Sequence, residues 1–145
     1  MGWLRKLLGK ELVSDKTNCV RVAVDDINSR MSQIKKAGSV DGVHYTDSVE
    51  KIKELKRLGR HDEAIELLLQ TVNSTEKESK AGGKGWGVAP WYYEQLAIIY
   101  RKEKRYAEEV SILERYEAQP KAPGVGPVKL AERLIRARLL VSKSS

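Results

Sequence analysis

The sequence WYYEQLAIIYRKEKRYAEEVSILERY, residues 91–116, decides the fold class because two amphipathic segments flank a run of five charged residues. The apolar residues of the first segment run from Tyr93 to Tyr100 at spacings of three, one and three, which places them on one face of a helix. Those of the second segment run from Tyr106 to Tyr116 at spacings of four, three and three. The charged run is too polar to be buried and is only long enough for a reversal. The stretch therefore predicts an antiparallel pair of helices.

A second hairpin is expected upstream, because the pattern repeats at a shift of 45 residues when Arg60 is aligned with Arg105. The matched pairs are Ile52 with Ala97, Leu55 with Tyr100, His61 with Tyr106, Ile65 with Val110 and Leu68 with Leu113. A helical hairpin repeated in tandem is typical of a solenoid. We therefore expect an all-α fold with two stacked hairpins.

Together these hairpins resemble the tetratricopeptide repeat family. The residues that carry the resemblance are Tyr93, the pair Leu96–Ala97 and Tyr100 in the second hairpin, and Gly59 with Asp62-Glu63-Ala64-Ile65 in the first. Two features depart from the family: Glu109 stands where a small residue is usual, and the spacing exceeds the family period of about 34 residues, which requires an insertion of about 11. The resemblance implies two antiparallel hairpins, a closing C-terminal helix, and a partner-binding groove formed by the first helix of each hairpin.

Two regions are expected. Residues 47–145 form the helical domain, in which a glycine-rich insertion at 79–90 stretches the period and Pro127 starts the closing helix. Residues 1–46 form an N-terminal segment with a helix near 24–36 that packs on the repeats. Its apolar stripe consists of Val24, Ile27, Met31 and Ile34. Since this stripe covers the first hairpin, we expect a protein that is mostly monomeric.

The start of the chain is open to more than one interpretation. Residues 1–10 suit a short helix with Trp3 and Leu4 on one side, which either covers an end of the stack or contacts a membrane surface or a partner. The alternation of Val20 and Val22 within residues 11–23 favours a strand, whereas the spacing that follows favours a helix.

Composition is that of a globular chain: 41% of the 145 residues are hydrophobic and 32% are charged. No apolar run approaches the roughly 18 residues that a membrane-spanning helix needs, so we expect no stable membrane insertion. The one cysteine, Cys19, excludes an internal disulfide. These features predict a cytoplasmic protein.

The net charge of +7 is concentrated at the ends of the chain. Residues 48–120 carry 13 basic and 13 acidic residues, whereas residues 121–145 carry six basic residues against Glu132 alone. A basic surface suits phosphate or an acidic protein, although it can equally be a solvated helix face. The candidates for phosphate contacts are Lys80 and Lys84 in the glycine-rich insertion, and Lys129, Arg133, Arg136 and Arg138 in the last helix.

Aromatic and polar residues near the predicted groove are the candidates for partner binding, because interfaces favour Trp, Tyr and Arg. They are Tyr92, Gln95, Ile99 and Lys102 of the second hairpin, Lys53 of the first, and the flanking Trp86 and Trp91. The family's clamp for acidic tails is not expected, since Val49 and Lys53 stand where it requires Lys and Asn.

No constellation with catalytic chemistry is found. His44 and His61 are not at metal-ligand spacing from each other or from Cys19. The glycine-rich stretch around Lys84 lacks the Gly-Lys-Ser/Thr of a nucleotide-binding loop. We therefore expect no enzymatic activity, no cofactor and no metal site.

The sequence thus predicts an adaptor that binds a peptide or helix of a partner protein in a helical groove. The alternative is a nucleic-acid-associated protein that contacts phosphates through its basic C-terminal helix and its glycine- and lysine-rich loop.

Overall fold

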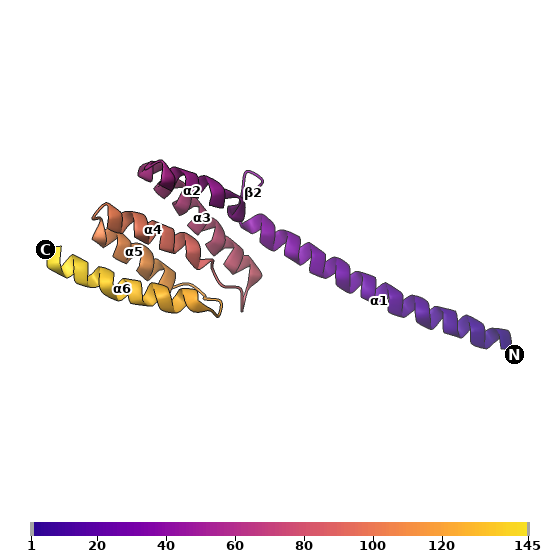
Figure 1. Cartoon of the computed structure of the whole chain (residues 1–145). Coiled ribbons are helices and arrows are strands. Elements are labelled where there is room, and N and C mark those ends of the chain that lie inside the picture. Colours follow the sequence, from indigo (N-terminus) through magenta and orange to yellow (C-terminus); the bar gives the residue numbers. More distant parts are fainter. Residues whose placement is uncertain (1, 145) are drawn as a thin grey trace. The chain divides into compact units, whose positions relative to one another are not determined.

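The computed structural model describes the backbone of residues 2–144 and the side chains of residues 19–144. Within that part of the chain the fold is all-α, as predicted, apart from one very short pair of strands (Figure 1). The elements are α1 (Gly2–Ala37), β1 (Ser39–Val40), β2 (Val43–His44), the 3-10 helix η1 (Tyr45–Ser48), α2 (Val49–Arg57), α3 (His61–Gly82), α4 (Pro90–Lys102), α5 (Tyr106–Glu117) and α6 (Val125–Ser144).

The chain divides into two units, the second of which begins at Ile34. The first unit consists of helix α1 up to Gln33. The predicted helix near 24–36 is therefore much too short, because α1 begins at Gly2. The chain contains no proline before residue 90 that would end a helix, and the strand suggested by the alternating valines does not form. Residues 1–18 carry no described side chains, so the role predicted for residues 1–10 lies outside the described residues.

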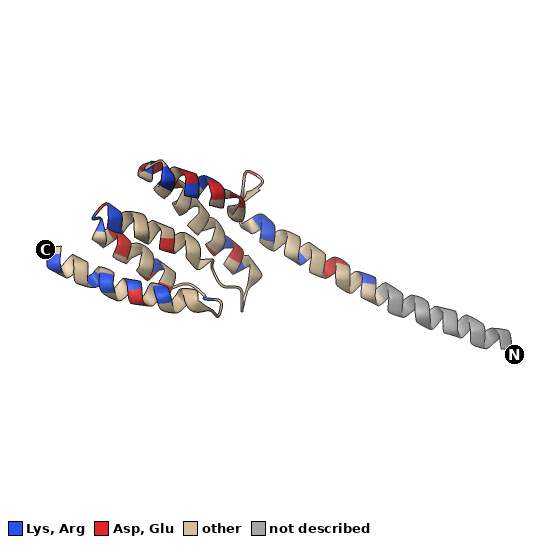
Figure 2. Cartoon of the chain, viewed as in Figure 1, with Lys and Arg blue, Asp and Glu red and all other residues tan. Residues whose placement is uncertain are grey.

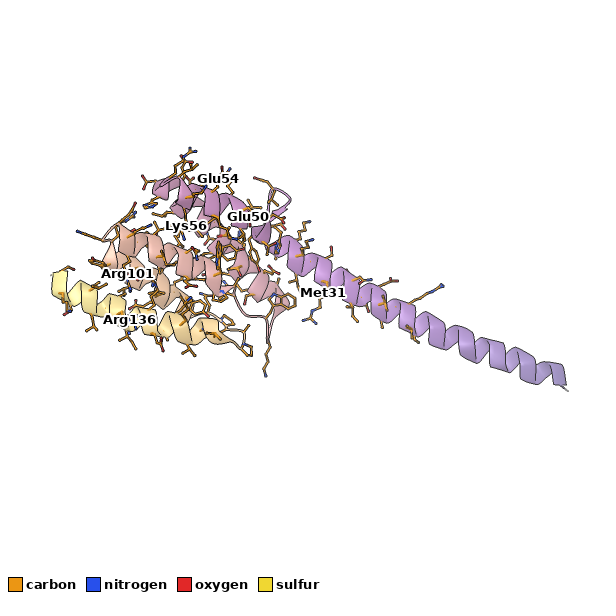
Figure 3. The ribbon with its side chains drawn as sticks, viewed as in Figure 1. Met31, Glu50, Glu54, Lys56, Arg101 and Arg136 are labelled. Carbon is orange, nitrogen blue, oxygen red and sulfur yellow. The ribbon has the colours of Figure 1, made fainter. Side chains whose placement is uncertain are left out.

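The apolar stripe of α1 is largely exposed. Val24 and Met31 (Figure 3) are each 48% exposed and Ile27 is 60% exposed, whereas Ile34 is 3% exposed. Of the four residues of this stripe only Ile34 is buried, and Ile34 belongs to the second unit. The packing of the helix on the repeats stays a prediction.

A short β-hairpin follows α1. Ser39 of β1 pairs with His44 of β2 in antiparallel register. The two residues of the turn, Asp41 and Gly42, have φ angles of 52° and 80°, the left-handed conformation that two-residue hairpin turns require. His44 then places its Nε2 atom 2.9 Å from Oε2 of Glu78 and so joins the hairpin to α3.

The second unit contains the two predicted helical hairpins, α2 with α3 and α4 with α5, followed by α6 (Figure 1). The same backbone hydrogen bond closes both turns, at positions 45 residues apart. Arg60 N donates to Leu55 O at 3.0 Å, and Arg105 N donates to Tyr100 O at 2.8 Å. His61 links the turns, because its Nδ1 atom lies 3.1 Å from Oε1 of Glu103.

The hydrophobic core is formed by residues of helices α2 to α6, and it uses the helix faces that the sequence predicted. Ile52, Leu68, Leu96, Leu113 and Leu130 are each at most 2% exposed. Ile135 of α6 is 59% exposed and lies outside this core.

The glycine-rich insertion is shorter than the predicted 79–90, and it is packed against α3. Helix α3 continues to Gly82, and the half-buried Trp86 folds back against it so closely that a Cβ atom on Gly82 would lie 2.4 Å from Trp86 Cγ. Val88 N donates to Pro120 O at 3.0 Å, and Ala89 N donates to Thr75 Oγ1 at 2.9 Å. The insertion is therefore part of the packed unit.

Candidate functional site

Three residues predicted to line a partner-binding groove are buried inside the fold. Tyr92 is 3% exposed, Gln95 is 9% exposed and Ile99 is 1% exposed. The Tyr92 ring meets the Tyr45 ring edge-on at 5.4 Å between centroids, and its hydroxyl donates to Tyr45 O at 3.3 Å. The groove prediction was therefore wrong for these three residues. For Tyr92 the reason is its cover by Tyr45 of η1, which periodicity within α4 cannot reveal.

The remaining groove candidates are scattered. Lys53 and Lys102 are exposed, and Trp91 is half-buried with its ring edge-on to Tyr92. Gln95 Oε1 accepts a hydrogen bond from Lys56, and burial, reinforced by the charge of Lys102, lowers the pKa of the Lys56 ammonium group. These contacts stabilise the fold, and they do not form a single open site.

Charged residues of α4 and α6 do come together in one cleft, which is the candidate site. A cavity of about 240 Å³ lies between the two helices. Its lining is Glu94 and Arg101 from α4, and Lys129, Glu132, Arg133 and Arg136 from α6. The α4 residues are seven apart, and those of α6 follow the i, i+3, i+4, i+7 spacing of one helix face. Figure 3 labels Arg101 and Arg136 on these neighbouring helices. We call this site the α4–α6 cleft.

Glu109 of α5 is paired with two residues of the lining of the α4–α6 cleft, although its own side chain has no exposed surface. Nη2 of Arg101 lies 2.8 Å from Glu109 Oε1, and Nε of Arg101 donates to Oε2 at 3.0 Å. Arg133 approaches the same carboxylate, with its Nε atom 3.4 Å from Oε1. Neither Arg133 Nε nor Glu109 Oε1 forms a hydrogen bond of regular geometry with any described residue. Two guanidinium groups thus share one carboxylate.

The electrostatics of the cleft follow from this sharing. Burial lowers the pKa of the Arg133 guanidinium, and the nearby positive charge of Arg101 lowers it further. Lys129 is compensated separately, because its Nζ atom lies 2.7 Å from Glu94 Oε1. Arg136 stands exposed at the rim (Figure 3). Four cationic side chains thus face two carboxylates in the lining and Glu109 beneath it, which leaves an excess of one positive charge.

The structure unites only part of the predicted basic set. Lys129, Arg133 and Arg136 share the cleft, whereas Lys80 and Lys84 belong to the end of α3 and the loop after it. Arg138 is exposed, and its Nη2 atom lies 3.3 Å from Glu114 Oε1. Basic positions recur along α6 beside a single acidic one (Figure 2).

Sequence reasoning missed Arg101 and Glu109. Arg101 belongs to a run of charged residues at a turn, where a solvated side chain is the ordinary interpretation. The signal for Glu109 was its presence at a position that is Ala64 in the first hairpin. A buried acid at a packing position implies basic partners, but the sequence alone does not say which ones.

The described side chains contain no group of three or more His, Cys, Asp or Glu residues placed to hold a metal ion. Among the helices in the described part of the chain, none combines the length and apolar character needed to cross a membrane. No protein-family model, no curated protein and no solved structure matches this sequence. The resemblance to tetratricopeptide repeats therefore stays a prediction.

Proposed function

We propose that this protein is a cytoplasmic adaptor with a tetratricopeptide-like helical domain, and that it binds an acidic segment of a partner protein at the α4–α6 cleft. The observation that carries the proposal is the sharing of the Glu109 carboxylate by Arg101 and Arg133. A carboxylate of the partner would supply the negative charge that these two guanidinium groups lack.

Hydrogen bonds between guanidinium and carboxylate groups are the chemistry that the cleft offers. Such charge-assisted bonds are about twice as strong as neutral ones. Arg136 is exposed at the rim and free to turn toward an incoming carboxylate, whereas Arg133 is held from below by Glu109. The arrangement suits a ligand that approaches from solvent and contacts Arg136 first.

Charge counting favours a protein segment over nucleic acid. The excess of one positive charge matches one carboxylate, whereas a nucleic acid presents a continuous row of phosphates. Glu94 and Glu132 in the same lining repel such a polyanion. Lys80 and Lys84, which the nucleic-acid hypothesis also requires, do not line the cleft.

The equivalence of the two hairpins supports the resemblance that underlies the adaptor proposal. Their turns form the same backbone hydrogen bond at positions 45 residues apart, Arg60 N to Leu55 O and Arg105 N to Tyr100 O. In a repeat stack α4 is the first helix of its hairpin, and α6 follows at the place of the next first helix. The α4–α6 cleft thus uses the first helix of a hairpin, as a repeat protein would, but through Glu94 and Arg101 and not through the groove candidates Tyr92, Gln95 and Ile99.

Fluorescence anisotropy with a labelled Glu-rich peptide and a labelled single-stranded oligonucleotide tests the proposal. We expect Arg136→Ala to weaken peptide binding about tenfold, because a charged hydrogen bond contributes roughly 1.5–3 kcal/mol. Arg138→Ala is the matched control, since it removes the same charge from the same helix outside the cleft. Tighter binding of the oligonucleotide, with equal losses in both variants and a steep dependence on salt, would instead support the nucleic-acid alternative.

A further inference from the structure

The outward face of α6 is apolar, and this feature is independent of the α4–α6 cleft. Val128 is 61% exposed, Ile135 is 59% exposed and Leu139 is 57% exposed. Their spacings of seven and four residues place them on one face of the helix. The opposite face carries Leu130 and Leu134, which are 2% and 3% exposed. Helix α6 thus has an apolar stripe on two sides, of which the core covers only one.

A hollow between α5 and α6 continues the exposed stripe. Its volume is about 340 Å³, and its walls are Leu113 and Tyr116 of α5 with Val128, Ala131 and Leu134 of α6. Glu117 and Lys121 also line it, and the ammonium group of Lys121 lies 5.4 Å from the centroid of the Tyr116 ring. Val128 belongs to both the hollow and the stripe, so the two form one surface. We call this surface the α6 apolar surface.

The α6 apolar surface has the dimensions of a helix-docking site. At a rise of about 1.5 Å per residue, the stretch from Val128 to Leu139 is about 16 Å long, or three helical turns. In a repeat stack, the helix that ends the array normally presents a polar outer face, because an apolar one needs a neighbour. The outer face of α6 does not fit that role.

We propose that the α6 apolar surface docks an amphipathic helix of a partner protein, and that acidic residues border the apolar face of that helix. Charge identifies the occupant. Helix α6 carries five Lys and Arg residues against Glu132 alone, and of those outside the α4–α6 cleft both Arg138 and Lys143 are exposed. An incoming helix with Leu or Ile at i, i+3 and i+4 would cover the stripe, while its Asp or Glu residues would meet these cations.

A second copy of this chain is a poor occupant by the same criterion. It would bring an identical basic α6, in a chain whose net charge is already +7. The exposed stripe of α1 is no better, because residues 19–37 carry four basic residues against Asp25 and Asp26. Like charges facing each other across an interface oppose association.

Titration of the full-length protein with two synthetic helical peptides tests this proposal by fluorescence anisotropy. Both peptides carry the same leucine stripe, bordered by Glu in one and by Lys in the other. We expect the Glu-bordered peptide to bind at least tenfold more tightly. We expect the double variant Ile135→Ser/Leu139→Ser to lose about tenfold or more of that affinity, as the burial of two large apolar side chains implies.

The control variant is Leu58→Ser, which removes a similarly exposed leucine from the opposite end of the repeat unit and should bind like the parent. All three substituted side chains are more than half exposed, so the variants should keep the parent melting temperature. Equal affinity for the two peptides, or no effect of the double variant, would overturn the proposal. So would light scattering that shows a parent dimer and a monomeric double variant, because a second copy would then be the occupant.

The Glu-rich peptide that tests the α4–α6 cleft carries no apolar stripe, and the variants that define the two sites do not overlap. Loss of the helical peptide in Ile135→Ser/Leu139→Ser with normal binding in Arg136→Ala would support the α6 apolar surface alone. Binding losses of equal size in both variants would overturn the independence of the two sites.

Discussion

The guanidinium of Arg101 and the carboxylate of Glu109 form a two-point ion pair, with Nη2 2.8 Å from Oε1 and Nε 3.0 Å from Oε2. Arg101 lies at the end of α4 and Glu109 in the first turn of α5, so the pair spans the turn of the second hairpin. Arg133 of α6 reaches the same carboxylate. One buried acid thus joins three helices, and a buried charge is tolerated only when it is paired.

The first prediction concerns this acid. Glu109→Ala should lower the free energy of unfolding by about 3–5 kcal/mol, because it leaves two partly buried guanidinium groups without their shared carboxylate. Urea denaturation followed by circular dichroism measures the change. Glu117→Ala is the control, since Glu117 is an exposed acid of the same helix and its loss should cost less than about 0.5 kcal/mol. Equal midpoints for the two variants would contradict the role given to Glu109.

The second prediction concerns the contact between Gly82 and Trp86. Gly82→Ala should destabilise the protein by about 1–3 kcal/mol, because the new methyl group would lie 2.4 Å from Trp86 Cγ, near the rigid base of that side chain. In a Trp86→Ala background the same substitution should be nearly neutral, because the obstructing ring is gone. Thermal melts of the four proteins give the coupling between the two positions. Additive effects would show that the loop does not pack on α3.

How far the sequence predicts this fold depends on how local each signal is. The register of the two hairpins was predicted because apolar spacing within a helix fixes its buried face, as Leu96 and Leu113 show. The length of α1 was missed because two alternating valines, Val20 and Val22, were weighed against a helical pattern that continued on both sides. The extension of α3 to Gly82 was missed because its last turns bury polar residues such as Thr75.

The site was harder to predict, because burial of a side chain depends on elements distant in sequence. The sequence predicted that Tyr92 faces a groove, but Tyr45, which lies 47 residues earlier, packs against it. Arg133 was a candidate from its charge, but the acid that holds it lies 24 residues away in another helix. Basic charge in the sequence therefore identified half of the lining residues of the cleft, and the others are known only from the contacts between helices.

The third prediction separates the two units. Removing residues 1–28 should leave the melting temperature nearly unchanged, because Val24 and Ile27 are exposed and the compact unit begins at Ile34. Removing residues 1–45 should cost about 3–6 kcal/mol, because it also removes the buried Ile34 and the Tyr45 ring that packs on Tyr92. Urea denaturation measures both, and size-exclusion chromatography with light scattering tests the expected monomer. Similar losses in the two truncations would show that the first unit stabilises the second.

The last prediction concerns stability at high pH. Burial, with smaller contributions from the nearby Tyr45 and Asp47, raises the pKa of the Tyr92 hydroxyl from 10.0 to about 12. The folded state therefore holds the Tyr92 proton more tightly than the unfolded state does. Its contribution to stability is fully present below pH 10 and is lost as the pH rises toward 12.

Tyr92→Phe removes this group with little change of shape, so the melting temperature of the variant should fall less steeply than that of the parent over this window. Part of the slope should remain, because burial also raises the pKa of Tyr93 and Tyr116. Melts recorded by circular dichroism at closely spaced pH values decide the matter: identical slopes for the two proteins would mean that the Tyr92 hydroxyl is not held protonated by its packing under η1.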